Sequence, residues 1–355
     1  MAGMHLRPLN IFIMMGVVCP LLYAAKAAQP SQSDLKTMVQ NAIATTGTIG
    51  NGLKPWHLKA TFQLFDEKGI AANYALDEIW AANLCQRIEW TGPKYHQIVF
   101  VSNQSIFSMG NTASPPEAVR EAWMGIVHPA PQAELLDDSI LALRPYSMGG
   151  IDYDCVMIAH SKSLLGSSQL GEIPTYCFEK SSRSLRVVSL NDSSWLTLNQ
   201  IDVIESMEVA NADTVVNGGV IVATGKTETL SALQPVDQSL LTPPTVARTD
   251  APVTPYVVLG IKMGKLINHP NPSYPDTERA QHNTGTVTLL AEIAPTGEIS
   301  RVEVEHTTSS AFADAAVAAI RQRRYTPATL NGKPVAIETT ITVGFTDGPY
   351  LLRNR

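Results

Sequence analysis

One stretch near the C-terminus decides the fold of that part of the chain: Val335-Ala336-Ile337-Glu338-Thr339-Thr340-Ile341-Thr342-Val343-Gly344-Phe345. Apolar side chains stand at every second position, and small or polar ones stand between them. This period of two predicts a β-strand with one buried face. The Asn331-Gly332 pair just before it is a strong signal for a hairpin turn. A long strand at the end of a small unit is expected to form a sheet edge with unpaired backbone groups.

The residues before this strand predict a compact α+β unit. Alternating apolar residues predict two further strands, over residues 285–293 and 299–304, joined by a turn at Pro295-Thr296-Gly297. A helix is expected from Ser310, as its cap, to Arg324, and a shorter one after Tyr274-Pro275. The fold class predicted for this part is therefore a three-stranded antiparallel sheet with two helices.

The order and spacing of these motifs resemble the C-terminal domain of the TonB family over residues 262–346. The resemblance implies docking on an outer-membrane receptor or another envelope protein by β-strand pairing, linked to transmembrane or protein transport. By the same resemblance, Glu338, Thr340 and Thr342 would line the pairing. The alternative is an edge capped by a homodimer mate or by residues 347–355. Arg323 stands where the family usually has Trp, and the N-terminal apolar stretch lacks the Ser and His of energised transducers, so coupling to proton-motive force is not implied.

The N-terminal body is predicted to be an antiparallel β half-barrel with helices. An amphipathic helix is expected over residues 33–47 with Ser33 as its cap, and short strands with turn signals recur over residues 56–233, interrupted by a helix over residues 116–127. This layout resembles LolA-like carriers of lipids or lipoproteins. That resemblance implies an apolar concave face able to hold a lipid or acyl chain. The alternatives are a filled interior and an envelope scaffold without cargo.

Residues 1–27 have the features of a secretory signal peptide. Arg7 precedes an apolar stretch over residues 9–25, and Ala25-Lys26-Ala27 ends it. We expect cleavage and a periplasmic protein; the alternative is an inner-membrane protein anchored by uncleaved residues 9–25.

Three cysteines remain after this segment, Cys85, Cys155 and Cys177. Cys155 and Cys177 both lie in strand-like runs, so we favour a disulfide between them, with three free thiols as the alternative.

A Pro-rich stretch over residues 234–256 divides the chain. It predicts a semi-extended linker between a β-rich domain (28–233) and the TonB-like domain (257–346), which a tail (347–355) follows. Acidic residues are concentrated before the linker, whereas charges after it nearly balance.

Chemistry-bearing motifs are not found in the sequence. With a formal net charge of −6 and no basic run with interleaved aromatics, nucleic-acid binding is not expected. The histidines form no HExxH pattern, and no G-x-S-x-G elbow or phosphate loop occurs. The sequence therefore predicts a non-enzymatic protein without a metal or cofactor.

Overall fold

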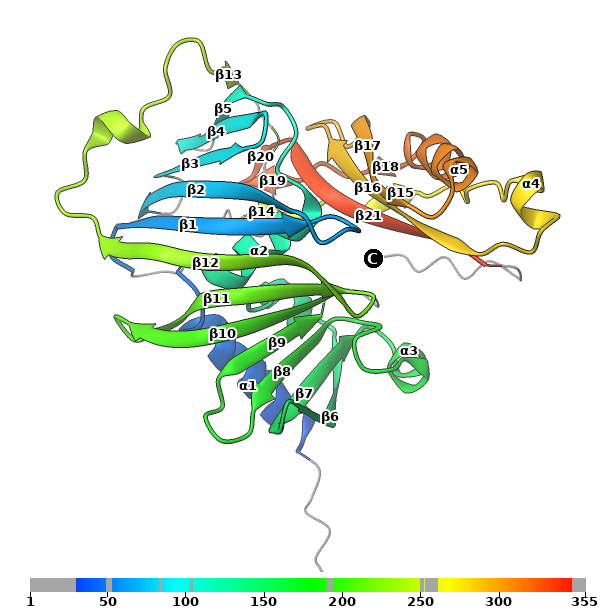
Figure 1. Ribbon diagram of the computed structural model, residues 1–355, viewed down its shortest axis with the longest axis horizontal. Coiled ribbons are helices and arrows are strands. Elements are labelled where there is room, and N and C mark those ends of the chain that lie inside the picture. The colour runs from blue at the N-terminus through cyan, green and yellow to red at the C-terminus, as the bar shows by residue number, and fades with distance from the viewer. Residues whose placement is uncertain are drawn as a thin grey trace, which may run out of the picture.

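The computed structural model describes residues 30–48, 53–82, 85–102, 105–189, 194–249, 252 and 261–346. The predicted signal peptide and the tail after residue 346 lie outside these residues. Figure 1 shows a large curved sheet with helices on its inner face and a smaller α/β unit beside it.

The large sheet has 13 strands in the order β13-β5-β4-β3-β2-β1-β12-β11-β10-β9-β8-β7-β6. Its strands pair antiparallel with neighbours that are mostly adjacent in sequence, as short turns require. The predicted antiparallel half-barrel is thus confirmed. The strands are β1 (Trp56–Phe65), β2 (Ala71–Ala82), β3 (Cys85–Gly92), β4 (Tyr95–Ser102), β5 (Ser105–Gly110), β6 (Ile140–Met148), β7 (Ile151–Ala159), β8 (Thr175–Glu179), β9 (Leu185–Ser189), β10 (Ser194–Ile204), β11 (Met207–Asn217), β12 (Val220–Ala232) and β13 (Arg248–Thr249).

Two helices cover the inner face of this sheet. Helix α1 (Gln32–Thr45) contacts β6, and α2 (Glu117–Val127) crosses β10, β11, β12 and β1. The cap of α1 is Ser31 rather than the predicted Ser33, because Ser31 and Asp34 form a capping box. A short helix, α3 (Lys162–Ser167), follows β7.

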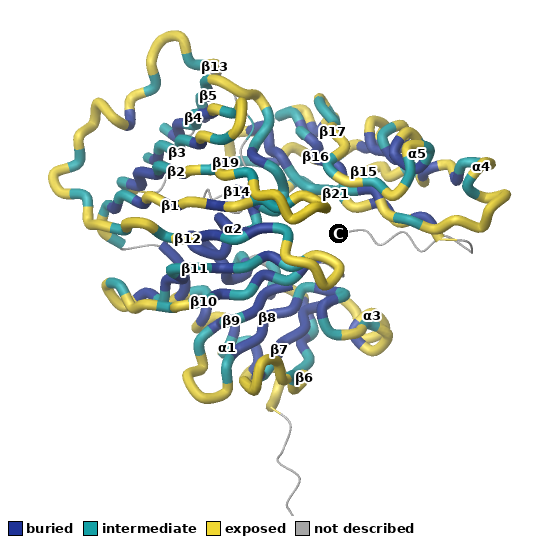
Figure 2. The backbone as a smooth tube through the Cα atoms, in the orientation of Figure 1, coloured by how far each residue is buried: buried dark blue, intermediate teal, exposed yellow. Residues whose placement is uncertain are grey.

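Alternation along the strands supplies the core beneath α2. In β1 the side chains of Trp56, Leu58, Ala60 and Phe62 are buried, and those of Lys59 and Thr61 are exposed. The buried set packs with Trp123 and other residues of both helices in one large cluster. Figure 2 shows this buried interior and the exposed turns at the ends of the strands. The inner face of the half-barrel is therefore largely filled by the protein's own helices.

The stretch expected to be an extended linker packs partly on the N-terminal body. It contains a 3₁₀ helix, η2 (Gln238–Leu241), whose Leu241 is buried, and β13, which pairs with β5. The linker thus adds a short strand to one edge of the large sheet.

The C-terminal unit contains a three-stranded sheet in the order β17-β16-β21. Its strands are β16 (Gly285–Ile293), β17 (Ile299–Thr307) and β21 (Ile337–Phe345), and its helices are α4 (Asp276–Arg279) and α5 (Ser310–Ile320). Five two- or three-residue strands complete it: β14 (Ile261–Lys262), β15 (Leu266–Asn268), β18 (Arg324–Tyr325), β19 (Thr329–Leu330) and β20 (Lys333–Pro334). The predicted three-stranded sheet with two helices is confirmed.

Two predicted boundaries of α5 are wrong. Ser309, not Ser310, caps the helix, because its side chain accepts a hydrogen bond from the amide of Ala311. The helix ends at Ile320, because Arg324 pairs with Asn268 in a short two-stranded sheet.

The turn between β16 and β17 is tightly packed at Gly297. Its φ is +85°, and a Cβ there would lie 1.9 Å from the Tyr325 carbonyl oxygen. Gly332 has a nearly equal φ of +84°, with no atom within 4 Å of such a Cβ. We expect Gly297→Ala to destabilise the protein by about 2 kcal/mol or more and Gly332→Ala by about 1 kcal/mol, because only the first adds a clash to the strain of positive φ.

Urea unfolding of the two variants measures this difference. Equal losses of unfolding free energy in the two variants would mean that the close approach at Gly297 contributes nothing.

Candidate functional site

The candidate docking site is the outer edge of β21. On one side β21 pairs antiparallel with β16, from Ile293↔Ile337 to Gly285↔Phe345. Among the described residues, no strand pairs with its other side. Backbone N–H and C=O groups along such an edge are able to accept an extended segment of another chain.

The three side chains predicted to line the pairing lie on one face of β21. Their surroundings differ: Glu338 is buried, Thr340 is half-buried and Thr342 is exposed. The opposite face of the strand carries Ile341, Val343 and Phe345, which pack against α5. The structure therefore brings Glu338 and Thr340 into an internal contact and leaves Thr342 open.

This internal contact is an interface between the two domains, formed around Arg120 of α2. The Arg120 guanidinium lies 3.1 Å from the carboxylate of Glu305 in β17, and it donates to Thr340 Oγ1 at 3.0 Å. The amide of Glu117 donates to Glu305 Oε1 at 3.0 Å, and the amide of Ser114 donates to Glu338 Oε1 at 3.2 Å. The start of α2 thus lies across the polar face of the C-terminal sheet, and the sequence analysis did not predict this arrangement.

An apolar contact accompanies the polar one. Val101 and Ile106 of the N-terminal domain pack with residues of the C-terminal unit in one buried cluster: Ile261, Ile293, Ala328, Leu330, Val335 and Ile337. At the margin of this cluster, Lys333 Nζ donates to Ser105 Oγ at 3.0 Å. The first part of β21 is consequently held between the two domains.

Several ionisable side chains are buried together at this interface, and burial shifts their pKa values. Burial, with repulsion from Glu121 and Glu305, raises the pKa of Glu117. Burial also raises the pKa of Glu121, whose carboxylate accepts from Ser194 Oγ at 2.7 Å. Burial alone would lower the pKa of the Arg120 guanidinium, but the carboxylate of Glu305 and its acidic neighbours raise it. Arg120 therefore stays charged and offsets several buried carboxyl groups.

Comparison with known families agrees with the geometry of the C-terminal unit. Residues 270–346 match the family model of the Gram-negative bacterial TonB protein C-terminal. This part of the chain is therefore similar to the TonB C-terminal domain. The match confirms the resemblance inferred from the Tyr-Pro, Asn-Gly and final-strand motifs. Comparison with curated proteins gives no match to the chain.

Solved structures similar to the chain include proteins named for the LolA superfamily or for lipoprotein sorting and a MucA/MucB complex. One is a LolA superfamily protein from Nitrosomonas europaea, with 10% identity, a TM-score of 0.39 and coverage of 59% of this chain and 97% of that one. A second is a putative outer membrane lipoprotein-sorting protein domain from Vibrio parahaemolyticus, with 9% identity, a TM-score of 0.41 and coverage of 60% and 97%. The Pseudomonas aeruginosa MucA/MucB complex matches with 11% identity, a TM-score of 0.23 and coverage of 74% and 81%. The first two names agree with the LolA-like resemblance stated from the sequence.

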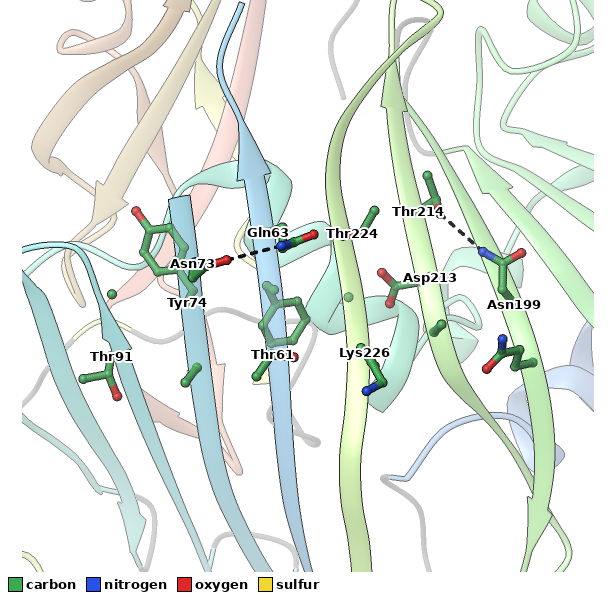
Figure 3. Close-up of a pocket in the computed structure, with 16 residues that line it drawn as sticks. Thr61, Gln63, Asn73, Tyr74, Thr91, Asn199, Asp213, Thr214, Thr224 and Lys226 are labelled. Carbon is green, nitrogen blue, oxygen red and sulfur yellow. Dashed lines mark hydrogen bonds between the residues drawn. The ribbon is translucent and has the colours of Figure 1, made fainter. Parts of the chain in front are cut away.

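A second surface feature is a shallow hollow of about 990 Å³ on the outer face of the large sheet, lined by both polar and apolar residues. Most of its lining side chains alternate with core residues along β1, β2 and β10 to β12 (Figure 3). Gln63 donates to Asn73 at 3.4 Å and Asn199 donates to Thr214 at 3.3 Å, so the amides partly satisfy one another. Asp213, which lies against Gly125 and Gly225, is buried, and burial raises its pKa well above the usual value. The hollow offers hydrogen-bonding groups without a cluster of charged ligands.

The predicted disulfide is confirmed. Cys155 and Cys177 are bonded, and they face one another directly on β7 and β8. Cys85 is free and half-buried. Within the described part of the chain, no group of three metal-ligating side chains gathers, and no helix is long and apolar enough to cross a membrane.

Proposed function

We propose that the protein is a periplasmic docking protein that binds an envelope partner through its TonB C-terminal domain. In this proposal an extended segment of the partner adds to the free edge of β21. The unpaired backbone of this edge carries the proposal, and the family match supports it. The role is binding and not catalysis, and it serves transport across the envelope or the assembly of envelope proteins.

The buried disulfide supports an oxidising compartment such as the periplasm. Export by residues 1–27 would place the protein there. Detection of those residues in the protein purified from membranes would contradict this localisation.

Cross-linking in cells tests the docking surface directly. A photo-reactive amino acid in place of Gly344 would extend into open space beside the outer part of β21, because no atom lies within 4 Å of a Cβ at that position. We expect it to capture a partner through one extended segment of that partner, identified by mass spectrometry. The matched control places the same group at Thr91, an exposed residue of β3 on the far sheet, where capture is not expected.

Proline substitution at Ile341 and at Thr342 tests whether the backbone carries the binding. Amides of consecutive strand residues point in opposite directions, so one of the two faces β16 and the other faces the free edge. Proline at the outward position is tolerated in an edge strand but removes a pairing donor. We expect that variant to fold normally and to capture the partner about tenfold less, a change of the size of one lost hydrogen bond. If both variants fold and capture normally, strand addition at β21 is wrong.

A lipid or lipoprotein carrier is the second candidate function. A groove of about 490 Å³ runs between α1 and the strands β6 to β9. Its lining includes five large apolar side chains: Leu35, Met38, Leu143, Phe178 and Leu185. Native mass spectrometry of the protein from cells would show a bound lipid mass if this groove carries an acyl chain. A protein that shows neither a lipid mass nor a captured partner would instead be an envelope scaffold.

A further inference from the structure

The two residues before β21 and the first two residues of the strand are more buried than an edge strand should be. Four consecutive residues are almost inaccessible: Val335, Ala336, Ile337 and Glu338 are 7%, 3%, 1% and 2% exposed. A strand with one solvated face shows burial at alternate residues only. From Thr339 onward β21 is more open, and Thr342 and Gly344 are exposed. The buried segment therefore comprises residues 335–338, of which Ile337 and Glu338 begin β21, and residues 339–345 form the more open part of the strand, where Thr340 contacts Arg120 through its side chain only.

The N-terminal domain contributes to the cover on both faces of residues 335–338, together with apolar residues of the C-terminal unit itself. Val101 and Ile106 belong to the same buried apolar cluster as Val335 and Ile337. On the opposite face, the amide of Ser114 binds the Glu338 carboxylate at 3.2 Å. Side chains of a partner strand that paired along Ile337 and Glu338 would meet these N-terminal residues on either face of the sheet.

Arg120 connects this cover to the middle of the C-terminal sheet. It is 6% exposed, and it spans the sheet face from Glu305 in β17 to Thr340 in β21. Removing one partner of a buried ion pair leaves the other charge uncompensated, which is strongly destabilising. In this interface the uncompensated group would be Glu305, whose Oε1 accepts from both Arg120 and the Glu117 amide.

We propose that the N-terminal domain restricts strand addition to residues 339–345, and that Arg120 is the positioning residue that maintains this restriction. The inference rests on the proposed docking function and defines the segment it accepts. Such a segment has about seven residues, because paired strands rise by the same distance per residue, about 3.3 Å. Its alternate side chains would lie beside Ile341, Val343 and Phe345 on one face, favouring apolar residues, and beside Thr340 and Thr342 on the other, favouring small polar ones.

Hydrogen–deuterium exchange of the full chain tests the cover without any partner. We expect Arg120→Ala to speed exchange of the amides in residues 335–340 by about tenfold or more, while residues 341–345 change little. Glu305→Gln, which keeps the shape but weakens the ion pair, should give a smaller change in the same residues. The control is Arg186→Ala, which removes an ion pair to Glu179 within the N-terminal domain at 3.2 Å. Unchanged exchange of residues 335–340 in both interface variants would overturn the inference.

Two labelled peptides of alternating threonine and valine, about seven and about eleven residues long, test the restriction itself by fluorescence anisotropy. Wild-type protein should bind both equally, because only the open part pairs. The Arg120→Ala variant should bind the longer peptide about tenfold more tightly than the shorter one, since extra backbone hydrogen bonds become available. Equal affinities in that variant would overturn the restriction. Faster exchange without binding of either peptide would leave the cover standing and contradict strand addition itself.

Discussion

Glu78→Gln is expected to remove much of the stability loss that the wild-type protein shows as the pH rises from about 4.5 to about 7. Glu78 of β2 is fully buried beneath α2. Its carboxyl oxygens accept from Trp123 Nε1 at 2.9 Å and from Gln86 Nε2 at 2.5 Å. Burial raises the pKa of Glu78 from 4.5 to about 7, and the two hydrogen bonds only partly oppose this shift.

The sign of the effect follows from proton binding. Between pH 4.5 and 7 the folded protein holds a proton on Glu78 that the unfolded chain has released. The free energy of unfolding is therefore highest below the unfolded pKa, and it falls as the pH rises through the folded pKa. The difference between the pKa of Glu78 in the unfolded chain and in the folded protein corresponds to a loss of about 3 kcal/mol in the free energy of unfolding. Glutamine has the same shape and still accepts from Trp123, but it does not titrate.

Urea unfolding at several pH values between 4 and 8 measures how the free energy of unfolding changes with pH in the wild type and in the Glu78→Gln variant. Asp213 is also buried with a raised pKa, so it contributes a slope of the same sign in both proteins. Subtracting the variant's free energy of unfolding from that of the wild type at each pH isolates the contribution of Glu78. Glu228→Gln is the control, because Glu228 is an exposed acid whose pKa is lowered by hydrogen bonds from Thr61 and Lys226. A Glu78→Gln curve parallel to that of the wild type would show that Glu78 is not held protonated in the fold.

The same carboxyl group links the body of the protein to its docking edge. Trp123 lies in α2, one turn after Arg120, so the helix that Glu78 holds on the sheet also holds the TonB C-terminal domain. Ionisation of Glu78 should therefore weaken the packing of α2 on the large sheet before it affects distant strands. Hydrogen exchange at pH 8 should show faster opening of α2 in the wild type than in the variant.

Local patterns in the sequence were sufficient to predict the elements of the C-terminal domain. The alternation of β21 and the Asn331-Gly332 turn depend only on neighbouring residues, and both φ angles of that turn are positive as expected. The contact between the domains depends on which surface meets which, and alternation does not specify this. Alternation placed Glu338 and Thr340 on a polar face that we expected to meet a partner, whereas Arg120 and Ser114 occupy that face.

One signal of the covered face was present in the sequence. Leu290 of β16 is an apolar residue among Thr286, Thr288 and Glu292, on the face opposite α5. It is 4% exposed, although a solvated face would leave it open. A large apolar residue on the polar face of a sheet indicates that a second surface covers it. The sequence had no comparable signal that Arg120 is the matching residue, because a charged residue near a helix start is ordinarily solvated.

Replacing both Cys155 and Cys177 with alanine is expected to lower the free energy of unfolding by about 3 kcal/mol, the value for a loop of this length. The bridge joins directly opposed residues of β7 and β8 and closes a loop of 22 residues that contains α3. Both sulfur atoms are in residues without exposed surface, next to Tyr153 and Val187. Without the bridge, the unfolded chain gains freedom in this loop while the folded strands keep their pairing.

The matched control is Cys85→Ser, because Cys85 is half-buried and unbonded. Urea unfolding should give it a much smaller loss than the double variant. A double variant as stable as the wild type would show that strand pairing alone holds β7 and β8. The bridge lies among β6 to β9, whereas the acceptor strand is covered through β4, β5 and α2. We therefore expect the double variant, at temperatures where it is folded, to capture its partner at Gly344 as the wild type does. Reduced capture by the folded double variant would mean that the two ends of the large sheet are coupled.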